Sequence, residues 1–259
     1  MQSTVPPVAE LNAPATWRTV DVVSDLHLQA SEPATVEAFA RYLDRTPADA
    51  VFLLGDVFEV WIGDDAATPG SFEAGCAAML RAASAGRALF LQHGNRDFLL
   101  GEAFARSAGL TLLADPTVLT LGGHRWLLSH GDALCLADTD YQRFRAEVRS
   151  DAWQQAFLAR PLEERRAIAR GLRNESESRK QPGTEYADAD TGAVQAWLAA
   201  AQAPVLVHGH THRPADHALP GGLRRLVLSD WDMAAIPPRA EALRIGTDGS
   251  AVRVPLAAG

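Results

Sequence analysis

The sequence of 259 residues predicts an α/β sandwich, and two observations lead to this fold class. The first is a set of short apolar runs, each ending in a cluster of Asp, His, Asn or Gly, which is typical of buried strands. The second is that helical patterns separate several of these runs, as in βαβ units. The runs lie at 19–28, 50–59, 88–97, 125–132, 204–213 and 224–232.

The predicted helices lie at 34–45, 72–86 and 98–109, where apolar residues recur at i, i+3 and i+4. Gly86 and Gly109 are expected to stop two of them, because glycine readily adopts the left-handed conformation that follows a helix. Two hairpins are also expected. One turns at Gly122–Gly123 and the other at Asp248–Gly249. The sheets are therefore expected to be mixed rather than purely parallel.

The chain is expected to form one domain with an insertion, because one α/β sandwich can reach about 200–250 residues. We expect residues 1–18 to be a flexible tail and residues 19–259 to form the domain. Residues 136–200 break the alternation of strands and helices and are rich in Arg, Trp and Phe. We interpret them as a helical cap inserted over the strand ends.

The composition excludes several classes of protein. Hydrophobic residues make up 47% of the chain, which is too many for a disordered protein, and the net charge of −8 argues against nucleic-acid binding. Cys76 and Cys135 form no CxxC pair, so we expect buried, reduced thiols in a cytoplasmic enzyme. We find neither a signal peptide nor an apolar run of ~18 residues, and expect a protein that is soluble or held at a membrane surface.

The polar clusters at the strand ends carry the chemistry. Parallel strands would bring them to one edge of a sheet, where uncompensated charges are costly and metal ions would remove that cost. Imidazole, carboxylate and amide oxygen without thiolate suit Mn²⁺, Fe²⁺ or Zn²⁺, and Asp56 is the best candidate to bridge two ions. The clusters are Asp25-x-His27, Gly55-Asp56, Gly94-Asn95-Arg96-Asp97, His130-Gly131-Asp132 and His208-Gly209-His210.

The order of these clusters resembles the calcineurin-like metallophosphoesterase family, which implies a β-sandwich flanked by helices with an inserted helical cap. The segments DLHL, GDVFEVWIGDD, HGNRDFLLG, HGD and HGHTHRP are similar to one subgroup, the UDP-2,3-diacylglucosamine pyrophosphatases of bacterial lipid A synthesis. Residues 152–176 resemble the cap of that subgroup more loosely.

The resemblance implies a role for each matching residue. Two Mn²⁺ ions would be bound, one by Asp25, His27, Asp56 and His210, and the other by Asp56, Asn95, His130 and His208. Catalysis would involve Asp56, Asn95, Arg96 and His130. Substrate would contact Asn95, Arg96, Asp138, Ser176, Lys180 and His208. The sequence after Ser176 departs from the pattern of the subgroup around Lys180, and Gly183 is a candidate for the neighbouring contact position.

The implied reaction splits UDP-2,3-diacylglucosamine into UMP and 2,3-diacylglucosamine 1-phosphate (lipid X) by attack of metal-activated water on the α-phosphorus. Arg96 agrees with this reaction on chemical grounds. Arginine cannot act as an acid at neutral pH, but it grips phosphate well. A phosphate leaving group with a pKa of about 6 needs no such acid. The alternative for Arg96 is a structural role, in an ion pair with Asp97 or another carboxylate.

The cap region allows two interpretations. Residues 141–180 contain ten basic and six acidic side chains, among apolar residues at helical spacing. They could form an ordinary amphipathic hairpin packed on the core, or a cleft for acyl chains with a basic face toward anionic lipid. The resemblance favours the second and implies peripheral contact with the cytoplasmic face of the inner membrane.

Two other functions compete with the lipid pyrophosphatase. A soluble nucleotide pyrophosphatase or phosphodiesterase would use the same metal site without an acyl cleft. A non-enzymatic scaffold with a decayed site would be expected to have lost ligands. Outside the ligand set, Asp132 is expected to orient His130, and His212 to orient a ligand or a turn.

Overall fold

The computed structural model describes residues 5–178 and 187–256, with the backbone alone described for 173–178. All six predicted strand runs contain a strand, and both predicted hairpins are present. The strands are β1 (Ala9–Asn12), β2 (Thr19–Val23), β3 (Ala50–Leu54), β4 (Ala88–Gln92), β5 (Leu110–Leu112), β6 (Thr117–Leu121), β7 (His124–Ser129), β8 (Val205–His208), β9 (Ala215–Ala218), β10 (Arg224–Val227), β11 (Glu241–Gly246) and β12 (Ala251–Pro255).

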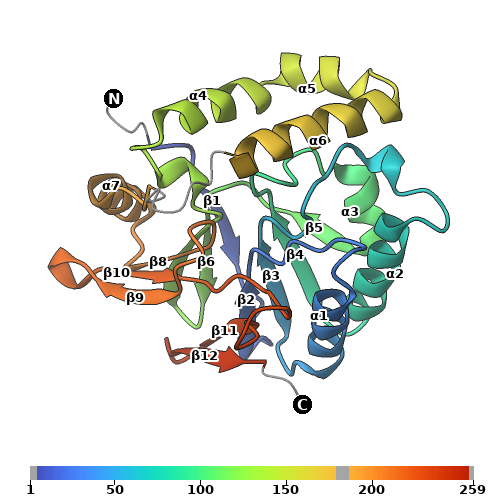
Figure 1. Ribbon diagram of the computed structural model, residues 1–259. Helices are drawn as coiled ribbons and strands as arrows, with labels where there is room; N and C mark the ends of the chain where they lie inside the picture. Colours follow the sequence, from blue (N-terminus) through green and yellow to red (C-terminus); the bar gives the residue numbers. More distant parts are fainter. Residues whose placement is uncertain (1–4, 179–186, 257–259) are drawn as a thin grey trace.

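The strands form two mixed sheets (Figure 1). One has the order β1-β6-β7-β8-β10-β9 and the other β12-β11-β2-β3-β4-β5. In the second sheet β2, β3, β4 and β5 run parallel, and in the first β7, β8 and β10 do so. The carboxyl ends of these parallel strands carry the polar clusters.

The first strand corrects an expectation. Residues 1–18 were predicted to be a flexible tail, but Ala9–Asn12 pair in parallel with Thr117–Thr120 of β6. This prediction was wrong because a four-residue edge strand with alternating exposure needs no apolar run. The first sheet therefore begins with the N-terminal segment.

The helices of the described chain are α1 (Pro33–Arg45), α2 (Phe72–Ser84), α3 (Glu102–Ala108), α4 (Thr139–Val148), α5 (Asp151–Leu158), α6 (Leu162–Ser178) and α7 (Thr191–Ala201). Gly109 caps α3 in the left-handed conformation (φ 70°), as predicted. Gly86 does not cap α2, which ends at Ser84 and is followed by a C-cap residue, Ala85, in right-handed geometry. None of the helices described in residues 5–178 and 187–256 is long and apolar enough to cross a membrane.

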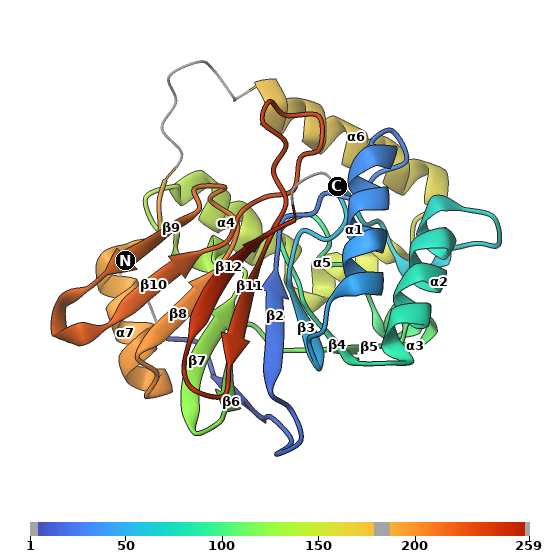
Figure 2. The ribbon, with the colours of Figure 1, turned by 90° about the horizontal axis from the view of Figure 1, so that it is seen from below.

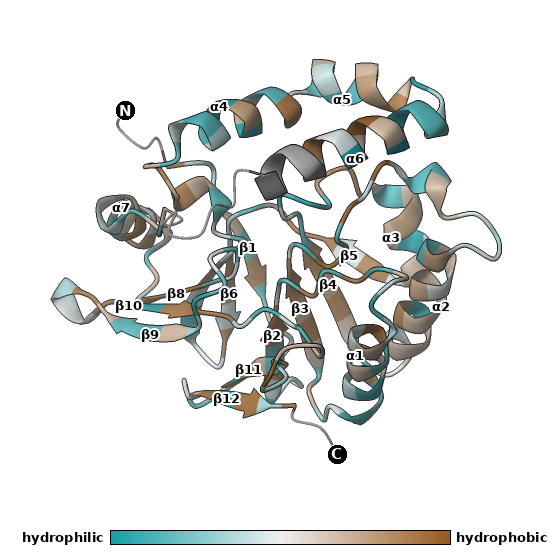
Figure 3. Cartoon of the chain, in the orientation of Figure 1, coloured by the Kyte–Doolittle hydropathy of each residue, from teal (hydrophilic) through white to brown (hydrophobic). Residues whose placement is uncertain are grey.

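Helices cover the outer faces of both sheets (Figure 2). Between the sheets, side chains such as Phe52, Leu128 and Val207 form a buried apolar layer, and the strands are largely hydrophobic in Figure 3. The helices α1, α2 and α3 pack on the outer face of the second sheet. On the other side, Val194 and Trp197 of α7 pack against strands β6, β7 and β8.

Within 136–200, the predicted cap, only part of the chain lies over the strand ends. The helices α4, α5 and α6 form a layer at the top of Figure 1, above the ends of the strands. The helix α7 instead covers the first sheet, because Val194, Trp197 and Leu198 are buried against Leu127 and Leu206. We therefore use the name cap for α4–α6 alone.

Candidate metal centre

The loops at the carboxyl ends of the strands bring the predicted ligands together. Asp25 follows β2, Asp56 follows β3 and Asn95 follows β4 in the second sheet. His130 follows β7 and His208 ends β8 in the first sheet, where Ser129 is paired with His208. Both sheets therefore supply side chains to one place.

The backbone turns sharply where these side chains emerge. Asp25, His27, Asp56 and His210 have positive φ values of 54°, 46°, 50° and 68°. His212 does so too, with φ 51°. Left-handed backbone is uncommon outside glycine, and Asp, Asn and His adopt it more often than other residues. The residue types that bind metals are therefore also suited to these turns.

Glycines let the loops approach closely. A Cβ atom on Gly94 would lie 2.1 Å from Oδ1 of Asp56, and one on Gly209 would lie 2.2 Å from Oδ2 of Asp25. Neither distance is possible for a real side chain. The glycines beside Asn95 and His210 therefore set the separation between neighbouring ligand loops.

Asp25, Asp56 and His130 form the centre of the site. One ligand atom from each lies within 4.8 Å of the others, and all three side chains are buried. Burial raises the pKa of Asp56 to about 6. Burial alone would lower the pKa of His130, but the carboxylates of Asp56 and Asp25 raise it to about 9. Without metal, a proton on His130 therefore compensates the two carboxylates.

Asn95 faces two histidines through its side-chain oxygen. Oδ1 of Asn95 lies 2.8 Å from Nδ1 of His210 and 3.0 Å from Nε2 of His130. The other ring nitrogen of His130, Nδ1, lies 2.8 Å from the carbonyl oxygen of Leu54, to which it can only donate. The Nε2 atom of His130 is therefore the one presented to the site.

His208 provides a test of whether the site suits a metal ion. Its Nδ1 lies 2.8 Å from the carbonyl oxygen of Gly209, to which it donates, and its Nε2 is buried without a hydrogen-bond partner. Burial lowers the pKa of His208 to about 4 and that of His210 to about 3, so both rings are neutral at pH 7. A buried lone pair on a neutral imidazole is what a metal ligand requires.

His27 lies at the other side of Asp25 and belongs to a second possible ligand group, Asp25, His27 and His212. Nε2 of His212 lies 3.2 Å from Oδ1 of Asp25 and 3.3 Å from Nε2 of His27. His212 thus contacts two predicted ligands, in agreement with the expectation that it orients one of them. Nδ1 of His27 lies 2.9 Å from Oε2 of Glu59, a residue that the sequence did not single out.

Arg96 lies beside this group. Its backbone N–H donates to Oδ1 of Asp56 at 2.8 Å, and its Nη1 lies 3.7 Å from Oε1 of Glu59. Asp97 is not its partner, because that carboxylate accepts backbone N–H groups, including those of Gly94 and Val57. The guanidinium of Arg96 therefore pairs with another carboxylate, that of Glu59, which itself contacts the candidate ligand His27.

Asp132 has another role than the one predicted. It does not orient His130, which is held by the carbonyl of Leu54. Its buried carboxylate instead accepts hydrogen bonds from Tyr141 (2.6 Å), Arg145 (2.7 Å) and Arg149 (3.3 Å) of the cap. Burial alone would raise the pKa of Asp132, but these arginines hold it well below its usual range. Asp132 therefore links the cap to the site.

The remaining predicted substrate contacts lie in or after the cap. Asp138 is exposed at the start of α4, where its carboxylate accepts the backbone N–H of Tyr141 at 3.0 Å. The ring of Tyr141 stacks on His210 at 5.8 Å, a neighbour that the sequence did not reveal. Ser176 is in α6, within the stretch described by its backbone alone, and Lys180 and Gly183 lie outside the described residues.

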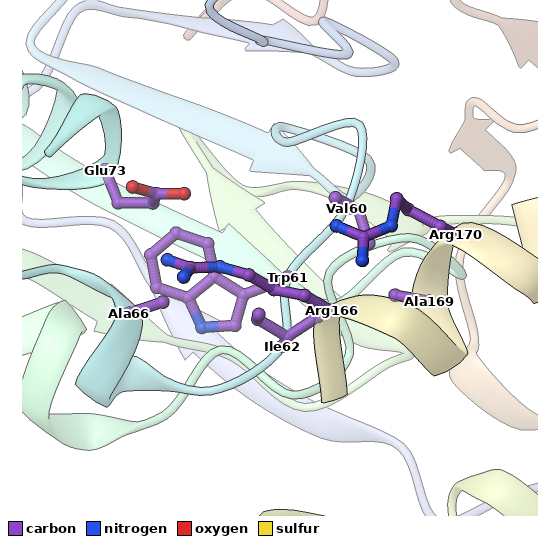
Figure 4. Close-up of a pocket in the computed structure, with 8 residues that line it drawn as sticks. All are labelled: Val60, Trp61, Ile62, Ala66, Glu73, Arg166, Ala169 and Arg170. Carbon is purple, nitrogen blue, oxygen red and sulfur yellow. The ribbon is translucent and has the colours of Figure 1, made fainter. Parts of the chain in front are cut away.

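A cavity of about 200 Å³ lies between the loop after β3 and the helix α6 (Figure 4). Its walls are mainly apolar, and two arginines of α6 also line it. Residues of the WIGDD motif form part of its wall, so this motif lies between the cap and the loop that carries Asp56. The lining residues are Val60, Trp61, Ile62, Ala66, Glu73, Arg166, Ala169 and Arg170.

A sandwich that gathers buried carboxylates, neutral imidazoles and an amide oxygen at its strand ends is the architecture of a metal-dependent hydrolase. Comparison with known families agrees, since residues 18–214 match the model described as calcineurin-like phosphoesterase. The chain belongs to the calcineurin-like phosphoesterase family.

Curated relatives match most of the chain, and all three that follow are named UDP-2,3-diacylglucosamine hydrolase. The protein of Pseudomonas putida strain W619 is 46% identical over 217 residues, which cover 82% of this chain and 90% of the relative. That of Aromatoleum aromaticum is 47% identical, covering 81% and 87%. That of Ralstonia nicotianae is 42% identical, covering 91% and 92%.

Proposed function

We propose that this protein hydrolyses the pyrophosphate bond of UDP-2,3-diacylglucosamine, giving UMP and 2,3-diacylglucosamine 1-phosphate, in lipid A biosynthesis. The observation that carries the proposal is the buried set of Asp25, Asp56 and His130 beside Asn95, in a chain whose curated relatives bear the name of this activity. Each step below rests on the contacts of these residues.

Two divalent ions, which we propose to be Mn²⁺, fit the donor set. The buried Nε2 of His208 and the paired approach of His130 and His210 to Asn95 support this proposal. When bound, the ions would activate water and neutralise charge on the phosphoryl oxygens. One ion would be held by Asp25, His27, Asp56 and His210, and the other by Asp56, Asn95, His130 and His208.

The side chains around the ligands would bind and orient the phosphates. Arg96 offers a fixed positive charge beside Glu59, which contacts His27, and Asn95 offers its amide N–H₂ in addition to the oxygen turned toward the histidines. His208 and Asp138 are further candidates for contact with substrate. Attack at the α-phosphorus, next to uridine, would release lipid phosphate, a leaving group that needs no protonation by Arg96.

The acyl chains require an apolar surface near the phosphates. The cavity beside α6 supplies apolar walls together with the guanidinium groups of Arg166 and Arg170 (Figure 4). Leu158 and Leu172 are 41% and 39% exposed on the cap. These features support peripheral binding of the cap to anionic lipid on the cytoplasmic face of the inner membrane.

The reaction can be tested with purified enzyme, Mn²⁺ and UDP-2,3-diacylglucosamine in ¹⁸O-labelled water, followed by mass spectrometry. The expected result is label in UMP, because attack at the α-phosphorus adds the new oxygen there. Label in the lipid phosphate would agree with the proposed substrate but would show that water attacks the other phosphorus. Hydrolysis of a soluble dinucleotide without any turnover of the lipid substrate would instead establish a soluble nucleotide pyrophosphatase.

A further inference from the structure

We propose that Glu59 is a positioning residue that holds the metal ligand His27 and the phosphate-binding Arg96 in one arrangement. This inference rests on the proposed metal centre and adds a residue outside its ligand set. Two contacts of one carboxylate carry it. Oε2 of Glu59 lies 2.9 Å from Nδ1 of His27, and Oε1 lies 3.7 Å from Nη1 of Arg96.

The backbone fixes where Glu59 lies. The chain after β2 and the chain after β3 are joined by hydrogen bonds from Leu28 N to Val57 O (2.9 Å) and from Glu59 N to Leu28 O (3.2 Å). Leu28 and Phe58 form a parallel bridge, and His27 and Glu59 are the chain neighbours of these two residues, so the bridge brings both chain segments together. The contact therefore follows from strand pairing and does not depend on the ion pair to form.

The same loop also fixes Arg96. Trp61 lies two residues after Glu59. Its backbone N–H donates to the carbonyl oxygen of Arg96 at 3.0 Å. The side chains of Glu59 and Arg96 are only 11% and 21% exposed. Water therefore has limited access, and the carboxylate holds the guanidinium more firmly than a surface pair would.

The position of Glu59 determines which nitrogen of His27 faces the site. Nδ1 of His27 is buried and lacks a well-aligned hydrogen bond, and leaving such a group unsatisfied is costly. The carboxylate at 2.9 Å is the acceptor placed to receive its proton. Nε2 is then left unprotonated in the neutral ring, on the side of Asp25 and His212. A carboxylate behind a ligating histidine commonly fixes its tautomer and orientation.

The test compares Glu59→Ala and Glu59→Gln with a matched control, Glu10→Gln, which removes a glutamate that pairs with Arg125 far from the site. The probe is Mn²⁺ alone, titrated calorimetrically into metal-free protein whose fold has been checked by circular dichroism. We expect Glu59→Ala to weaken Mn²⁺ binding by about 10–100-fold. Glu59→Gln retains an oxygen acceptor for His27 and is expected to lose less Mn²⁺ affinity. Glu10→Gln is expected to lose none.

A second measurement separates the two contacts. Arg96→Ala should leave Mn²⁺ affinity unchanged and raise the KM for substrate, whereas Glu59→Ala should change both. Saturating Mn²⁺ should restore kcat in Glu59→Ala but not its KM. If folded Glu59→Ala binds Mn²⁺ as tightly as the unchanged protein, the role of Glu59 is refuted.

The titration needs no substrate, so it also tells this proposal apart from the proposed reaction. Glu59→Ala could lose metal affinity even if the unchanged protein does not cleave UDP-2,3-diacylglucosamine. That result would support the positioning role of Glu59 and refute the proposed substrate. Absence of Mn²⁺ binding by the unchanged protein would overturn the metal centre and the role of Glu59 with it.

Discussion

Arg149, directly after α4, donates a hydrogen bond from Nη2 to the carbonyl oxygen of Gly94 at 2.9 Å, across 55 positions of the chain. Gly94 precedes Asn95, so the cap holds the loop that presents a predicted metal ligand. The same Nη2 lies 3.3 Å from Oδ2 of Asp132, the residue that follows His130 and Gly131. Cap and metal centre are therefore parts of one hydrogen-bonded unit.

The first prediction concerns Asp132. Asp132→Ala removes a buried carboxylate and leaves Arg145 and Arg149 without their counter-charge. Breaking a buried pair in this way is expected to lower the free energy of unfolding by about 3–5 kcal/mol. Chemical denaturation measures this change. Glu102→Ala is the control, because its pair with Arg106 is exposed, and an equal loss in both variants would contradict the prediction.

The second prediction concerns Asn95 and His130. Asn95→Ala or His130→Ala should reduce kcat by at least about 100-fold at saturating Mn²⁺, because each removes an atom from the proposed centre. Steady-state kinetics on folded protein provide the measurement. His217→Ala, in the edge strand β9, should retain full activity. Substantial turnover by either site variant would show that the second metal position is assigned wrongly.

The third prediction is that metal binding releases protons. The pKa of His130 is raised to about 9 by the nearby carboxylates, so the ring is protonated at pH 7.5 in metal-free protein. Ligation requires the neutral ring, so the apparent affinity should fall about tenfold per unit as the pH decreases below 9. Below about pH 6 the protonation of Asp56 should make the decrease steeper.

Proton release can be measured by calorimetry in buffers of different ionisation enthalpy. At pH 7.5 the observed heat should vary with the buffer in proportion to the protons released. A heat that is the same in all buffers would mean that His130 is already neutral in the metal-free protein.

The fourth prediction concerns the thiols. Cys76 and Cys135 are 3% and 2% exposed, and burial raises the pKa of each to about 12. Both should therefore resist iodoacetamide at pH 8 in folded protein, since the thiolate is the reactive form. Mass spectrometry should find two modified cysteines after unfolding in guanidinium and none before. Modification of folded protein would indicate that one of these regions opens readily.

The strand ends could be predicted because two signals coincide there. Asp25, Asp56 and His130 each follow a buried apolar run, and the carboxyl ends of such strands meet at one edge. Glu59 gave no comparable signal. It is a single charged residue in a loop, and its contacts depend on the pairing of Leu28 with Phe58, which no local pattern encodes.

The limits of the cap could not be predicted for a similar reason. The helix α7 lies in the same segment between β7 and β8 as the cap helices, and its contacts with Leu127 and Leu206 assign it to the sheet. The partners of Asp132 were missed because two side chains of α4, and that of Arg149 directly after it, converge on Asp132 from 9 to 17 positions away. Long-range pairing of this kind is set by tertiary structure.

The left-handed turns at Asp25, His27, Asp56 and His210 restrict how this site can change over evolution. Lengthening a ligand from aspartate to glutamate would alter its reach and also put a less tolerant residue into a strained conformation, which costs on the order of 1–3 kcal/mol. Asparagine or glycine would keep the backbone while losing charge. Lineages derived from such a protein should therefore lose its metal ions through Asn and Gly substitutions, with the loops themselves unchanged.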